Sequence, residues 1–133
     1  MLILTCPYCG VHAEETELAP GGEAHIARHG PGSSEADFED YLFARQNTRG
    51  VVFERWRHAY GCGKWFLAAR DSVTLQVFGT YPAQSKAPPA DLLARIQAAR
   101  PGWQAPASVE AAPAGRAGDD YAANPTPARD SLA

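Results

Sequence analysis

The sequence predicts an α+β fold: a small zinc-ribbon-like antiparallel sheet with one main helix, followed by an extended C-terminal tail. Three observations predict it. Two short Cys/His clusters lie far apart in the chain, runs of aromatic and β-branched residues flank the second cluster, and the composition shifts to Ala, Pro and Gly from Pro82 onward. With 133 residues, of which 45% are hydrophobic, the chain can build one modest core but not two.

Five segments have the residue pattern of short strands. Residues 2–5 lead into the first cluster, and residues 23–28 follow a turn-forming glycine pair. Residues 51–58 lead into the second cluster and residues 65–69 return from it antiparallel, which places this cluster at a hairpin tip. Apolar and polar residues then alternate over residues 73–81, so the last three strands form a meander.

The main helix is predicted between the second and third of these strands. A serine at position 33 or 34 caps its start, and residues 47–50 end it. Phe38, Tyr41, Leu42 and Arg45 recur at steps of three and four residues, which gathers the first three on one face of the helix. We therefore expect an amphipathic helix packed on the sheet.

The C-terminal third of the chain has a different character. Only residues 91–100 show helical spacing there, and little apolar surface follows Trp103. The sequence thus divides into a zinc-binding α+β domain at 1–81, a linker with a docking helix at 82–103, and a flexible Ala/Pro-rich tail at 104–133.

The two clusters together supply three thiolates and one imidazole. Cys6 and Cys9 are three apart in the first cluster, and His58 and Cys62 are four apart in the second, each followed by glycine after the cysteine turn. Zinc favours this soft ligand set, and four ligands close a tetrahedral structural site with no open position. All three cysteines are used, so no odd thiol is left.

Other assignments of these residues stay open on the sequence alone. Cys6 and Cys9 also suit a redox dithiol, although such a pair normally begins a helix, and Pro20 soon interrupts this segment. His12 is the rival of His58 for the fourth ligand position, and we prefer His58 because it pairs with a cysteine in its own cluster.

A second histidine pair carries a weaker signal. His25 and His29 are four apart, but Gly22 before them and Pro31 after them disfavour the helix that would make them half of a metal site.

Charge and composition exclude several classes of protein. The formal net charge of −3 and pI near 5.7 argue against a nucleic-acid module, which would present a basic face. We expect no membrane segment, because no apolar stretch is long enough to span a bilayer and residues 1–4 are too short for a signal peptide. Free thiols suit a cytoplasmic protein. We find no catalytic constellation.

Ordered motifs over about residues 1–81 resemble the delta subunit of heterotetrameric sarcosine oxidase. They are Cys6-Pro7-Tyr8-Cys9-Gly10, residues 21–28, Asp40 to Arg45 with Asn47 and Gly50, Glu54 to His58, Gly61-Cys62, Trp65-Phe66 and Arg70-Asp71. The Ala/Pro-rich segment after about Pro82 departs from that family's pattern.

The resemblance implies a small non-catalytic subunit that binds zinc through Cys6, Cys9, His58 and Cys62. It implies alpha, beta and gamma partner subunits, with NAD in alpha and with FAD and covalent FMN for amine oxidation and electron transfer to oxygen. The complex would convert sarcosine to glycine, with formaldehyde or methylene-tetrahydrofolate and hydrogen peroxide as products. The alternatives of another class are a free-standing zinc-ribbon adaptor and a small redox protein.

A subunit needs a surface for its partners. We expect it among the aromatic and basic residues near the second cluster, and in the helix of residues 91–103, whose apolar stripe would dock on a neighbouring subunit. The stripe consists of Leu92, Leu93, Ile96 and Trp103.

Overall fold

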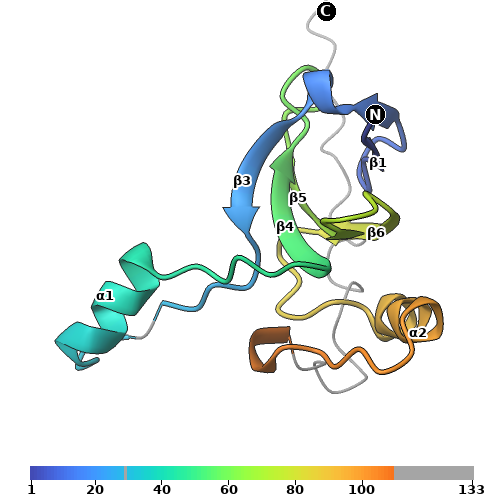
Figure 1. Ribbon diagram of the computed structural model, residues 1–133. Helices are drawn as coiled ribbons and strands as arrows, with labels where there is room; N and C mark the ends of the chain where they lie inside the picture. Colours follow the sequence, from blue (N-terminus) through green and yellow to red (C-terminus); the bar gives the residue numbers. More distant parts are fainter. Residues whose placement is uncertain (29, 110–133) are drawn as a thin grey trace, which may run out of the picture.

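The computed structural model describes residues 1–28 and 30–109, and these form two antiparallel sheets and two α-helices (Figure 1). A two-stranded sheet pairs β1 with β2, and a four-stranded sheet has the order β3-β4-β5-β6. The strands are β1 Ile3–Thr5, β2 His12–Glu14, β3 Ala19–Glu23, β4 Val51–Arg57, β5 Trp65–Asp71 and β6 Val77–Pro82. The helices are α1 Glu35–Phe43 and α2 Ala90–Ala99, with 3-10 turns at Glu15–Glu17 and Ala107–Val109. The predicted fold class is confirmed.

The hairpin of β4 and β5 is the centre of the larger sheet. Its register is continuous from Val51 opposite Asp71 to Arg57 opposite Trp65. Because strand side chains alternate between faces, this hairpin contributes to a core on each side of the sheet. The loop from residue 58 to 64 forms its tip, as the sequence predicts.

One core lies on each face of the hairpin. On one face, β-strand residues pack against α2 and the last 3-10 turn; on the other, they pack against the β1-β2 hairpin. The first core includes Phe53, Leu67, Tyr81, Leu92 and Ile96, and the second includes Leu4, Cys6, Trp56, Phe66 and Ala68. The second core places the N-terminal hairpin beside the tip of β4 and β5.

Helix α1 occurs where the sequence predicts it, but its predicted packing is wrong. Ser34 is its N-cap, and the Ser34 hydroxyl accepts a hydrogen bond from the Asp37 amide at 3.1 Å. No residue of α1 is buried. Figure 1 shows the helix at the end of two long connections, away from both sheets.

Helix α2 covers the sheet instead. Leu92 is 1% exposed and Ile96 is 0% exposed, and both belong to the first core. The chain's own sheet thus buries Leu92 and Ile96 of the stripe that we expected to dock on a neighbouring subunit, and the docking of this segment stays a prediction. The proposed division at residue 81 stays a prediction, although this core includes residues on both sides of it.

The predicted tail begins within the described part of the chain. Val109 is 2% exposed and packs on the first core, so the segment of residues 104–109 is attached to this core through Val109. The rest of the predicted tail, residues 110–133, lies outside the described residues.

Two strands begin at different residues from those predicted. The glycine pair predicted as a turn lies inside β3, which ends at Glu23, so residues 24–28 are not a strand. Gly21 belongs there because Trp65 packs against it: a Cβ on Gly21 would lie 2.4 Å from the Trp65 ring. As an edge strand, β3 also tolerates Pro20.

The last strand starts at Val77 rather than at residue 73. Before it, the Asp71 carboxylate accepts hydrogen bonds from the amides of Val73 at 2.8 Å and Thr74 at 3.1 Å. Such local bonds stabilise a turn and compete with strand pairing. The turn also holds Leu75 at a φ of 63°.

Among the described residues, no helix has the length and apolar character needed to cross a membrane.

Candidate metal centre

The first Cys/His cluster is a tight turn between β1 and β2. The Gly10 amide donates to the Cys6 carbonyl at 2.9 Å, and the Cys6 amide donates to the Val11 carbonyl at 3.0 Å. Gly10 has a φ of 73°, a left-handed conformation that glycine adopts without steric cost. We call this turn, residues 6–10, the first knuckle; it aims two sulfur atoms to the same side.

The second cluster repeats this backbone pattern at the tip of the β4-β5 hairpin. The His58 amide donates to the Lys64 carbonyl at 3.0 Å, and the Gly63 amide donates to the His58 carbonyl at 2.8 Å. Gly63 also has a φ of 73°. This turn, residues 58–63, is the second knuckle.

Packing and one backbone bond bring the knuckles together. Cys6 itself belongs to the second core with Trp56 and Phe66. The Tyr60 amide donates to the Glu17 carbonyl at 3.1 Å, which joins the second knuckle to the turn after β2. Two segments whose residues are 49 to 56 positions apart therefore meet at one point.

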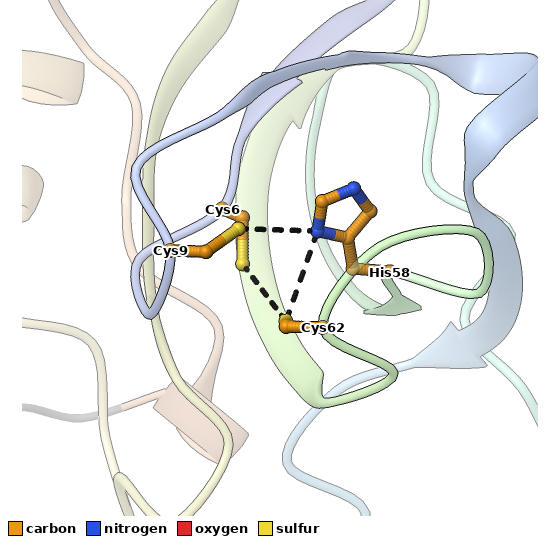
Figure 2. Close-up of side chains that lie close together, drawn as sticks. All are labelled: Cys6, Cys9, His58 and Cys62. Carbon is orange, nitrogen blue, oxygen red and sulfur yellow. Dashed lines mark hydrogen bonds between the residues drawn. The ribbon is translucent and has the colours of Figure 1, made fainter.

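The four predicted ligands converge there. One ligand atom from each of Cys6, Cys9, His58 and Cys62 lies within 4.8 Å of all the others. Figure 2 shows the imidazole Nδ1 of His58 turned toward the sulfur atoms. The Cys6 and Cys62 sulfurs are 3.6 Å apart, and His58 Nδ1 is 3.4 Å from the Cys9 sulfur and 3.7 Å from the Cys62 sulfur.

These separations fit a tetrahedral zinc site. With Zn–S bonds of about 2.3 Å, the edge between two sulfurs of a tetrahedron is about 3.8 Å, and an S–N edge is slightly shorter. The three measured separations lie close to these lengths. The donors are also right for zinc, and four of them leave no coordination position for a substrate. The residues present therefore fit a closed structural site.

The site is half enclosed. Cys6 is 0% and His58 2% exposed, whereas Cys9 and Cys62 are on the surface. Burial raises the pKa of the Cys6 thiol, while the Val11 amide lowers the pKa of Cys9 by hydrogen bonding to its sulfur. The Val11 amide thus favours the thiolate of Cys9, the form that binds metal, whereas burial favours the thiol of Cys6.

Gly61 lies against the ring of a predicted ligand, a role that the ligand spacing in the sequence does not show. A Cβ on this residue would lie 2.2 Å from both Cε1 and Nε2 of His58 and 2.5 Å from Nδ1. The imidazole therefore packs flat on the backbone of the second knuckle, and only glycine fits beneath it. A glycine between two ligands was the available signal.

His12 and His25, the other histidines in the described part of the chain, do not join this cluster. His12 is exposed, and its Nδ1 is 2.8 Å from the Thr5 hydroxyl. His25 is hydrogen-bonded through Nε2 to the Tyr81 hydroxyl at 2.7 Å, and burial lowers its pKa. Its predicted weak partner, His29, lies outside the described residues.

The surroundings of Cys6 and Cys9 also disfavour a redox dithiol. Cys9 is followed by the Gly10 turn and by β2, so no helix N-terminus in the described part of the chain follows either thiol. With a third sulfur and an imidazole in reach, metal binding explains the arrangement better than disulfide chemistry does.

The fold and the four-residue cluster define this chain as a small α+β protein with a Cys/His cluster, on two hairpin turns, that could hold a metal ion. Comparison with known proteins gives the family. The chain belongs to the sarcosine oxidase, delta subunit family, whose family model matches residues 3–83. This range includes all four residues of the centre. A sarcosine oxidase delta subunit is one chain of a complex enzyme and is not its catalytic subunit.

Individual relatives agree. The chain is 41% identical to the sarcosine oxidase subunit delta of Corynebacterium sp. strain P-1 over 90 residues, which is 66% of this chain and 91% of the relative. The match to the Arthrobacter sp. subunit has the same identity and coverage. The Rhizobium meliloti strain 1021 subunit is 33% identical over 85 residues, 64% of this chain and 90% of the relative.

Proposed function

We propose that this chain is the zinc-binding structural subunit of a heterotetrameric, flavin-dependent sarcosine oxidase. The observation that carries the proposal is the family match over residues 3–83, a range that includes the four convergent ligand atoms of Cys6, Cys9, His58 and Cys62. Neither half of the site binds zinc well alone, because each knuckle offers only two donors.

The zinc would act on folding and assembly. It would join the β1-β2 hairpin to the tip of the β4-β5 hairpin, two elements that otherwise share one small core. Structural zinc contributes about 10–16 kcal/mol of binding free energy in small domains, and this becomes folding free energy when the site forms only in the folded chain. A rigid subunit would then present a fixed surface to its partners.

Substrate chemistry would take place in the other subunits. The family assignment supports alpha, beta and gamma partners, which would hold NAD, FAD and covalent FMN. The complex would oxidise sarcosine with O₂ and water to glycine, formaldehyde and hydrogen peroxide, or pass the one-carbon unit to tetrahydrofolate. The reduced cysteines support a cytoplasmic location, where thiols stay free for metal.

Purification of the full-length chain with its partner subunits tests this proposal. We expect one equivalent of zinc per chain, flavin in the copurified large subunits, and peroxide formed from sarcosine by the complex alone. Sarcosine-dependent peroxide from the isolated chain would refute the non-catalytic role. Failure of the tagged chain to retain any flavin-bearing subunit would refute the assignment to the complex.

A further inference from the structure

Helix α1 has an apolar stripe that nothing among the described residues buries. Phe38 is 43% exposed, Leu42 is 44% exposed, and Tyr41 between them is half-buried. At about 100° per residue these three side chains share one side of the helix. A nine-residue helix is marginal in water without tertiary packing, so α1 would gain stability if this stripe packed against another surface.

The stripe opens onto space rather than onto the sheet. Tyr41 and Leu42 line an open hollow of about 730 Å³, and its lining also includes Arg55 and Leu67 of the β4-β5 hairpin. This volume is in the range of ligand and side-chain sites in proteins. Apolar side chains of another molecule can therefore enter between α1 and the sheet.

The charges of α1 specify the chemistry of that molecule. The helix has four carboxylates and no basic residue. At about 100° per residue, Glu35 and Glu39 border the stripe on one side and Asp37 borders it on the other. The chain itself shows how this surface takes a cation, because the Arg28 guanidinium lies over the Phe38 ring, 6.0 Å from its centroid.

The charges that line the hollow restrict where basic groups can go. Arg45, Arg55 and Lys86 outnumber the one acidic lining residue, Glu23, so the lining repels a cation inside the hollow. Basic residues of a partner therefore fit better along the outer flanks of α1 than within the hollow.

We propose that α1 is the docking arm by which this chain holds a partner subunit, through an apolar segment of that subunit flanked by Lys or Arg residues. The inference rests on the proposed function, because it assumes that the partner is another chain of the oxidase. It assigns to α1 the role that the sequence pattern suggested for α2.

Paired variants in the copurified complex test the stripe. The double variant Phe38→Ala/Leu42→Ala, called the pair, removes most of the stripe. Phe43→Ala is the matched control, because Phe43 is 76% exposed and lies about 140° around the helix from Phe38. Loss of one interface anchor costs at least about 2 kcal/mol, or about 30-fold in Kd, so we expect at least this weakening for the pair. We expect the control to change Kd by less than about threefold.

Because no residue of α1 is buried, the pair should keep wild-type zinc content and thermal stability in the isolated chain. Wild-type affinity of the pair for the flavin-bearing subunits would overturn the inference while the proposed function stands. Equal weakening by Phe43→Ala would overturn it as well. If the wild-type chain itself binds no such subunit, the proposed function fails first.

A charge variant tests the flanks. Glu39→Lys should weaken association at low salt and lose most of this effect at high salt, whereas Glu15→Lys, an exposed acidic residue of another element, should not. Equal effects of the two variants would contradict a basic-flanked partner.

Hydrogen exchange distinguishes the occupants of the stripe. We expect fast exchange of α1 amides in the isolated chain and protection in the complex. If α1 is protected in the isolated monomer, this chain itself covers the stripe, and the proposal is refuted. The proposal is also refuted if the isolated chain forms a dimer that the stripe variants dissociate.

Discussion

Substitution of Gly61 by Ala should disable the metal centre without touching a ligand. The added Cβ would lie 2.2 Å from two atoms of the His58 ring, whereas nonbonded carbon contacts are normally about 3.5 Å or longer. The ring must therefore move by about 1 Å. A zinc ligand tolerates only about 0.2 Å, so the shift takes Nδ1 out of bonding position unless the knuckle itself deforms.

The cost can be estimated from core overpacking. Forcing an extra methyl group into a packed site costs about 1–3 kcal/mol, which is about 5- to 150-fold in zinc affinity when folding and binding are linked. We expect the upper end, because His58 is only 2% exposed and its ring has little room to relax. Competition with a chromophoric chelator measures the affinity, and cobalt substitution reports the ligand set through its thiolate charge-transfer bands.

Gly63→Ala is the matched control for this substitution. Gly63 has a φ of 73°, and an added methyl group would meet no atom within 4 Å, so alanine there causes backbone strain but disturbs no ligand. It should lower stability by about 1–2 kcal/mol and keep the zinc stoichiometry. Wild-type zinc affinity in Gly61→Ala, or equal loss in both variants, would refute the packing argument.

Particular contacts support three more predictions. Elemental analysis should show that Cys6→Ser and Cys62→Ser each lose zinc, whereas His12→Ala retains one equivalent. Loss of metal in His12→Ala would contradict the assignment of His58 as the fourth ligand. Ile96→Ala should lower the unfolding free energy of the zinc-loaded chain by about 2–5 kcal/mol in urea, with a smaller loss for the half-buried Leu93→Ala; equal, small losses would contradict the burial of α2. The pKa of Asp71 lies below its ordinary 3.8 because its carboxylate accepts hydrogen bonds from the amides of Thr74 and Val73 and from the Arg100 guanidinium. Ionised Asp71 therefore stabilises the fold above that pH, and this stabilisation is lost as the pH falls through the folded-state pKa. The melting-temperature difference between wild type and Asp71→Asn should therefore shrink in acid, and a difference that does not depend on pH would contradict this.

The sequence determined the chemistry of the candidate centre. Three cysteines and one histidine in two glycine-containing turns offer a soft set of four donors if the turns meet, because donor type and local turn geometry are properties of a few adjacent residues. For the same reason the β4-β5 hairpin and the start of α1 after Ser34 were predictable. Strand alternation and helix capping act over only a few residues of sequence.

Long-range contacts decided the rest. Gly21 became part of β3 because Trp65, 44 positions later, packs against it. This contact has no local signal, since a glycine pair in a strand and one in a turn look alike in sequence. The contact of Gly61 with the His58 ring spans only three positions, but a turn glycine by itself does not show that an imidazole packs on it.

The two helices show most clearly what only the tertiary structure decides. Both α1 and α2 have apolar residues at helical spacing, so the sequence could not tell which stripe meets the sheet. The structure buries Ile96 of α2 and leaves Leu42 of α1 44% exposed. The physical reason is that periodicity defines which side of a helix is apolar, whereas the path of the chain between elements defines what that side faces.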